Sequence, residues 1–158
     1  MKQVISNKIC RTIAGIGPVG NLPASGTWGS LVALPFAWIL AGTWGLSFLI
    51  ILSFILGILT IRPLIAGDKK EKDPSFVIID EFMGQLFVFS IFPKDLMSPI
   101  ILIFGFLFFR LFDILKPWPA SFFDRKVHSS FGVMMDDFVA GFYAMILLAF
   151  MMIISYHL

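Results

Sequence analysis

Five carboxylates interrupt or flank long apolar segments of this 158-residue chain: Asp80, Glu81, Asp113, Asp136 and Asp137. An ionisable group inside such a segment is costly and usually faces a polar interior or a wet cavity. The chain has one cysteine and two histidines, so its hard carboxylate oxygens suit Mg²⁺ or Mn²⁺ rather than zinc. We therefore expect the five acids to share one polar site that holds one or two magnesium ions.

A simpler interpretation is that the acids only flank helices, because the dipole of a helix favours Asp and Glu at its start. That interpretation is sufficient for Asp136 and Asp137. It fits Asp80 less well, since four apolar residues precede it. It fits Asp113 poorly, since this residue ends its segment, where the dipole disfavours an anion. The shared site is therefore the favoured interpretation.

Basic residues stand beside the acids. Arg110 and Lys116 each lie three residues from Asp113, so on a helix they share its face. Both are candidate ligands for a phosphate group. The alternatives are an ion pair between Arg110 and Asp113, and a Lys116 side chain that extends to the lipid headgroups.

Two further segments offer polar groups. Thr27 and Ser30 stand among glycines at the expected start of a helix, where backbone N–H groups and hydroxyls bind an anion or cap the helix. The spacing of Ser121 and Asp124 predicts a short helix with Asp124 in its cap. His128 follows Asp124 by four residues and is a candidate proton carrier and substrate contact.

The composition identifies the environment in which these residues act. Hydrophobic residues make up 58% of the chain and charged residues 14%, and the mean hydropathy is +0.93. A soluble domain of this size could not hide so much apolar surface, and a disordered chain would be rich in charge. The net charge of +2 gives no indication of nucleic-acid binding. We therefore expect an integral membrane protein.

The elements that must position the acids are membrane-spanning helices. A span needs about 20 mostly apolar residues, and about five segments qualify: 28–41, 44–61, 76–92, 97–115 and 137–155. The first is short and contains Pro35, so it is tilted, kinked or re-entrant. The fold class is thus all-α, a polytopic helical bundle with one domain over residues 1–158.

Basic residues predict the orientation, because they are enriched in cytoplasmic loops. Five spans place ten of them on the side of the N-terminus: Lys2, Lys8, Arg11, Arg62, Lys69, Lys70, Lys72, Lys116, Arg125 and Lys126. The other side has only Lys94. We therefore expect a cytoplasmic N-terminus, and all five acids then lie near the cytoplasmic face.

The polar motifs, in this order, resemble the phosphatidylglycerophosphatase A family. The resemblance rests on residues 25–30 with Pro35, 80–84, 109–119, 123–128 and 132–141. It implies a multi-pass enzyme of the bacterial inner membrane that requires Mg²⁺ and removes the phosphomonoester of phosphatidylglycerophosphate to give phosphatidylglycerol. The expected substrate is thus a phospholipid, and no protein partner is predicted.

The residues suggest how such a reaction would run. Asp80, Glu81, Asp113, Asp136 and Asp137 would hold Mg²⁺, Lys116 and Arg110 would bind the phosphate, and a metal-activated water would attack in line. Two other classes of membrane protein fit these residues less well. A CDP-alcohol phosphatidyltransferase needs an Asp-Gly and Ala-Arg motif that is not found, and a cation transporter would place its acids near the middle of the bilayer.

Overall fold

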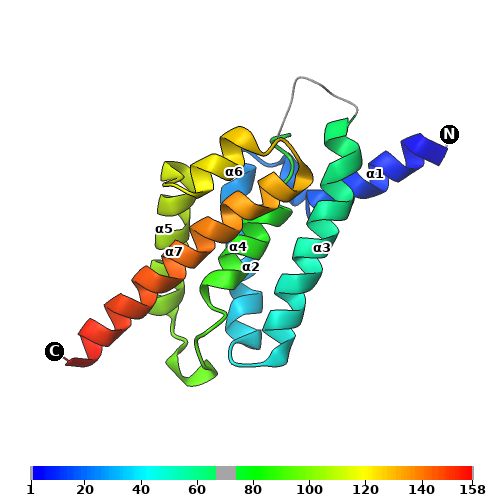
Figure 1. Ribbon diagram of the computed structural model, residues 1–158. Coiled ribbons are helices and arrows are strands. Elements are labelled where there is room, and N and C mark those ends of the chain that lie inside the picture. Colours follow the sequence, from blue (N-terminus) through cyan, green and yellow to red (C-terminus); the bar gives the residue numbers. More distant parts are fainter. Residues whose placement is uncertain (1, 67–73, 158) are drawn as a thin grey trace.

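The structure is a computed structural model that describes residues 2–66 and 74–157 (Figure 1). Over these ranges the chain is helical, with no strand, which confirms the all-α prediction. The helices in chain order are α1 (Lys2–Ala14), η1 (Val19–Asn21), α2 (Ser25–Leu40), α3 (Trp44–Ala66), α4 (Ile79–Val88), η2 (Lys94–Leu96), α5 (Pro99–Leu115), α6 (Ala120–Lys126) and α7 (Ser130–His157).

Among residues 2–66 and 74–157, two helices are long and apolar enough to cross a membrane, judged by length and composition. They cover Trp44–Ile65 in α3 and Ser130–Ser155 in α7, with 22 and 26 residues. At 1.5 Å per residue both exceed the roughly 30 Å of a hydrocarbon core. Large apolar side chains are exposed at helical spacing along the outer side of α3, among them Ile51, Ile55 and Leu59. Such a surface is suited to lipid rather than to water.

The prediction of about five spans is not confirmed, because the other three segments form helices of fewer than 18 residues. Segments 28–41 and 97–115 correspond to α2 and α5, of 16 and 17 residues. Segment 76–92 contains only the ten-residue helix α4, which is about 15 Å long and covers half of a hydrocarbon core. The backbone turns on both sides of α4 and so limits its length. Helix α4 packs against α2, α3, α5 and α7. It is a core helix whose residues are nearly all buried.

Helix α1 was not predicted from the sequence, and it holds the segment that leads into α4. The N–H of Ile78 donates to the Ala14 carbonyl over 2.9 Å. The Arg11 guanidinium lies 4.2 Å from the centre of the Phe76 ring, a cation–π contact. These contacts fix the chain just before Asp80.

The two ends of the bundle differ in their polar residues. Figure 1 shows α1, α6 and the starts of α2, α4 and α7 at one end, and the α2–α3 turn with η2 at the other. Lys94 belongs to the second end, where its ammonium donates to the Trp38 carbonyl. The last carbonyls of a helix lack partners within the helix, so Lys94 serves to close α2.

Helices α4 and α7 approach closely through two glycines. A Cβ atom placed on Gly141 would lie 2.5 Å from the carbonyl oxygen of Gly84. A Cβ atom on Gly84 would lie 2.7 Å from the carbonyl oxygen of Asp137 and from the ring of Phe109. Both distances are shorter than van der Waals contact, so only glycine permits this backbone-to-backbone packing.

We predict that Gly141→Ala destabilises the protein although alanine is the better helix former. The new methyl would force α4 and α7 apart, at a cost of about 1–3 kcal/mol. Thermal unfolding of the detergent-solubilised protein measures the effect. Gly45→Ala is the control, since its methyl would meet only side-chain atoms of Leu40 and Thr43 at 3.2 Å. Equal midpoints for the two variants would contradict the prediction.

Candidate active site

Three carboxylates meet where α4 and α7 begin to pack. Asp80, Glu81 and Asp137 each offer an oxygen, and these oxygens lie within 4.8 Å of one another. Asp80 precedes Gly84 by one helical turn, and Asp137 precedes Gly141 by one turn. The close approach of the two glycines therefore brings the aspartates together. We call Asp80, Glu81 and Asp137 the acid cluster.

The acid cluster is suited to a hard cation. Asp80 and Asp137 are 4% and 3% exposed, so water can screen their mutual repulsion only weakly. The Asp80 Oδ1 atom is buried, and within the part of the chain that the structure describes it accepts no hydrogen bond. Three carboxylates are an all-oxygen donor set of the kind that Mg²⁺ prefers. The acid cluster thus contains three of the five predicted ligands.

The helix starts place these acids differently from the sequence interpretation. Asp80 and Glu81 lie in the first turn of α4, where the helix dipole favours an anion. Helix α7 begins at Ser130, seven residues before Asp137, because the Ser129 hydroxyl caps it by accepting the Gly132 N–H over 3.3 Å. Asp136 and Asp137 therefore do not open their helix as predicted. The dipole does not account for their presence.

Arg110 and Asp113 stand beside the acid cluster. The Arg110 Nη1 atom lies 2.6 Å from an Asp113 oxygen, which is the ion pair that the sequence offered as the alternative to phosphate binding. A Cβ atom on Gly26 would collide with the Glu81 carboxylate and lie 3.4 Å from Arg110 Nη1. The side chains of Glu81 and Arg110 thus both lie against the first turn of α2, at Gly26. Asp113 lies close enough to interact electrostatically with Asp80 and Asp137.

Lys116 makes ion pairs with two acids. Its ammonium lies 2.5 Å from an Asp136 oxygen and 3.1 Å from an Asp124 oxygen. Burial alone would lower the pKa of Lys116, but the Asp136 carboxylate outweighs burial and raises the pKa above its ordinary value. Lys116 ends α5 with φ of 42°, a left-handed conformation that non-glycine residues rarely adopt. Asp136, a predicted metal ligand, is therefore the counter-ion of Lys116.

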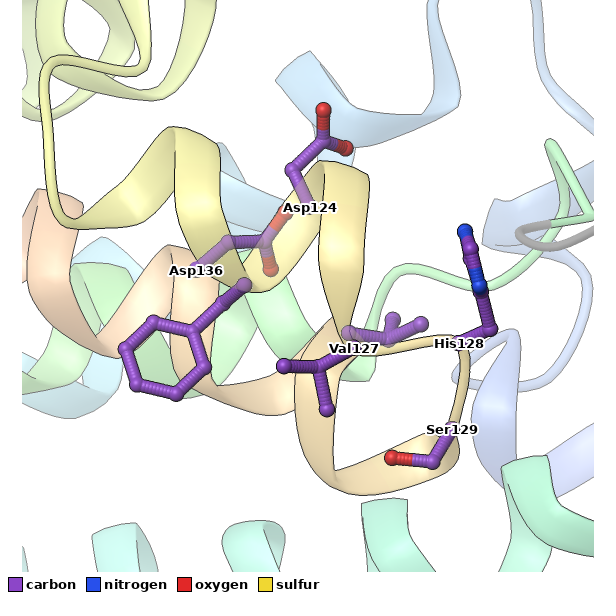
Figure 2. A pocket seen from close by; sticks show the side chains of 7 residues that line it. Asp124, Val127, His128, Ser129 and Asp136 are labelled. Carbon is purple, nitrogen blue, oxygen red and sulfur yellow. The ribbon is translucent and has the colours of Figure 1, made fainter.

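A small pocket of about 60 Å³ adjoins Asp136. Figure 2 shows the Asp124 and Asp136 carboxylates near each other and the His128 imidazole farther along the wall. His128 is exposed and lines this pocket. The sequence interpretation placed Asp124 in a helix cap, whereas α6 begins at Ala120 and Asp124 pairs with Lys116. Only the turn between α5 and α6 brings these two residues together.

The start of α2 differs from the expected anion site. The N-cap is Ala24, which has a left-handed conformation and no side-chain cap. Thr27 is half-buried in the first turn. The Ser30 hydroxyl is buried in the second turn, where it donates to the Gly26 carbonyl over 3.0 Å and lies 3.5 Å from Arg110 Nη1. The Ser30 hydroxyl therefore lies beside Arg110 and does not cap the start of the helix. Thr27 is the less buried of the two residues.

Known proteins of one family are similar to this chain in sequence. A family model described as phosphatidylglycerophosphatase A matches residues 12–152. A phosphatidylglycerophosphatase A of Haemophilus influenzae is 37% identical over 148 residues, which cover 92% of this chain and 89% of the relative. A protein of the same name from Escherichia coli K12 is 34% identical over 130 residues, which cover 81% and 72%. No solved structure matches the chain.

The family match spans the helices that carry the acid cluster, Arg110 and Lys116, and it confirms the resemblance seen in the sequence. The chain belongs to the phosphatidylglycerophosphatase A family.

Proposed function

We propose that this protein hydrolyses the phosphomonoester of phosphatidylglycerophosphate, giving phosphatidylglycerol and inorganic phosphate, with one or two Mg²⁺ ions held by the acid cluster. The observation that carries the proposal is the meeting of three carboxylates within 4.8 Å, beside Arg110, in a member of this family. Nothing in the comparisons supports the transferase or the transporter.

The side chains around the cluster have distinct parts in the proposed reaction. Magnesium, when bound, neutralises charge on the phosphate oxygens and makes a water molecule more acidic. Arg110 binds the phosphate, because its guanidinium lies next to Glu81, one of the proposed metal ligands. The Asp113 carboxylate orients that guanidinium. The Lys116 ammonium contributes positive charge on the other side, held by Asp136 and Asp124. Phosphoryl transfer needs mainly such positioning and charge neutralisation.

Substrate contacts beyond the phosphate come from groups near the same end of the bundle. Thr27 is half-buried at the start of α2, and the exposed His128 lines the pocket beside Asp136. We propose that they contact the glycerol phosphate headgroup, while the acyl chains lie along the exposed apolar surface of the helices. Catalysis then takes place where the headgroup meets the protein, without the lipid leaving the membrane.

We further propose that the protein is a multi-pass protein of the bacterial inner membrane, with its N-terminus and active site at the cytoplasmic face. The support is the ten-to-one distribution of basic residues and the gathering of α1 and α6 at the end that carries the acid cluster. Lys94, the basic residue of the other end, has a structural contact with α2.

Replacing a ligand by its amide separates metal binding from the other parts of the site. We predict that Asp80→Asn and Asp137→Asn lower phosphate release from phosphatidylglycerophosphate by on the order of 10²-fold or more, because the amide removes an anionic ligand. EDTA should abolish the wild-type activity and Mg²⁺ should restore it. Asp95→Asn, exposed at the far end, is the control. Normal turnover of either variant at low Mg²⁺ would show that the replaced residue is not a ligand.

The phosphate ligands should affect the reaction without changing its metal dependence. We predict that Arg110→Lys and Lys116→Ala each lower kcat/KM by roughly 10²-fold, as for loss of a preorganised charge. Arg110→Lys loses the planar fork that binds two phosphate oxygens at once. The Mg²⁺ concentration for half-maximal rate should stay within about twofold in both variants, since no metal ligand is removed. Initial rates against lipid and against Mg²⁺ measure both quantities, and an unchanged kcat/KM would assign that cation a structural role.

Reporter fusions test the orientation. We predict that reporters joined after Lys126 and within the loop around Lys70 show a cytoplasmic location, and that a reporter after Lys94 shows the opposite location, because basic residues are retained in the cytoplasm. A control fusion at His157 should report the same side as Lys94. A cytoplasmic signal at Lys94 would place the acid cluster on the wrong face for this proposal.

A further inference from the structure

Gln85 is a fully buried amide in the middle of helix α4. Neither its Nε2 nor its Oε1 atom has a hydrogen-bond partner among the residues that the structure describes. Buried side-chain amides are nearly always hydrogen-bonded, because an unpaired one is strongly disfavoured in an apolar interior. Its neighbours in the chain, Gly84 and Leu86, are also buried and offer no polar side chain. No contact among the described residues therefore explains why an amide is buried at this position.

The position of Gln85 directs it toward the acid cluster. Gln85 follows Glu81 by four residues, so the two side chains share a face of α4. Helical side chains lean toward the N-terminus and cover the preceding turn. The Gln85 amide thus extends toward the turn that carries Asp80 and Glu81. That turn also contains the buried Asp80 Oδ1 atom, which accepts no hydrogen bond within the described ranges.

We propose that Gln85 is a positioning residue for the acid cluster, whose amide N–H donates to a cluster carboxylate when the cluster binds its cation. The inference rests on the proposed metal site. Carboxylates that bind a metal are themselves held by hydrogen bonds, and loss of such a partner typically weakens metal affinity by 10–100-fold. Gln85 is suited to this part because its amide is buried and, among the described residues, its N–H groups have no acceptor.

The variant Gln85→Met separates a positioning role from a merely tolerated polar residue. Methionine has nearly the same length and no amide, so it removes the unpaired group without opening a cavity. In EDTA, the thermal midpoint of the purified protein in detergent should therefore rise by roughly 2–4 °C. The Mg²⁺ concentration that gives half of the thermal stabilisation should rise about tenfold or more, and the concentration for half-maximal phosphatase rate should rise with it. Stability without the metal would thus increase while the affinity for Mg²⁺ decreases, a combination that loss of packing cannot produce.

Leu86→Met is the matched control, because Leu86 is equally buried on the same helix and has no polar group. Its Mg²⁺ midpoints should equal those of the wild type. Wild-type Mg²⁺ midpoints in Gln85→Met would overturn the proposal, as would a lower thermal midpoint in EDTA, which would reveal a structural partner for the amide. If Mg²⁺ stabilises neither the wild type nor any variant, the metal site itself fails, and that result is visible without the variant.

Discussion

The backbone contact between Gly84 and Gly141 determines the geometry on which the rest of the site depends. Two helices can approach to this distance only if neither carries a side chain at the crossing. One turn before each glycine stands an aspartate, so the close contact brings Asp80 and Asp137 together. The free energy of packing between α4 and α7 offsets the repulsion between these two carboxylates, which would otherwise move apart. The site is thus built from the crossing outward.

The charges around the crossing are arranged in two groups. Arg110 pairs with the single carboxylate of Asp113, and Lys116 lies between two carboxylates, those of Asp124 and Asp136. Each pair leaves a cation near the acid cluster, held in place by an acid that is not part of it. The acid cluster brings three carboxylates together, with Asp80 and Asp137 buried, and an all-oxygen donor set of this kind favours a divalent cation. The six carboxylates thus fall into two groups: Asp113, Asp124 and Asp136 form ion pairs, and Asp80, Glu81 and Asp137 form the acid cluster.

The surroundings explain why these polar groups can persist. The outer faces of α3, α5 and α7 expose apolar side chains, while α4, which carries two of the acids and Gln85, is enclosed by four other helices. Polar groups are thus inside and apolar groups outside, as expected for a protein surrounded by lipid. A short central helix is possible because its irregular ends are covered by protein rather than by hydrocarbon. The same enclosure keeps the carboxylates dry and strengthens their interactions.

The amino-acid sequence by itself determined the fold class and the set of candidate site residues. Composition indicates a membrane protein, the apolar segments predict the helices, and the motifs that carry the acids identify the family, because each of these depends on residue type and local spacing. The pair of Arg110 and Asp113 was predictable for the same reason, since three residues on a helix always share a face.

Tertiary structure alone decided which acids meet. Asp136 and Asp137 are adjacent in the chain, yet one pairs with Lys116 and the other joins the acid cluster. Successive residues of a helix point about 100° apart, and only the packing of α4 and α5 against α7 gives each direction a partner. The pairing of Lys116 with Asp124 likewise depends on the left-handed turn at Lys116, and the length of α4 depends on the helices around it. These features arise from contacts between distant segments, which local spacing does not encode.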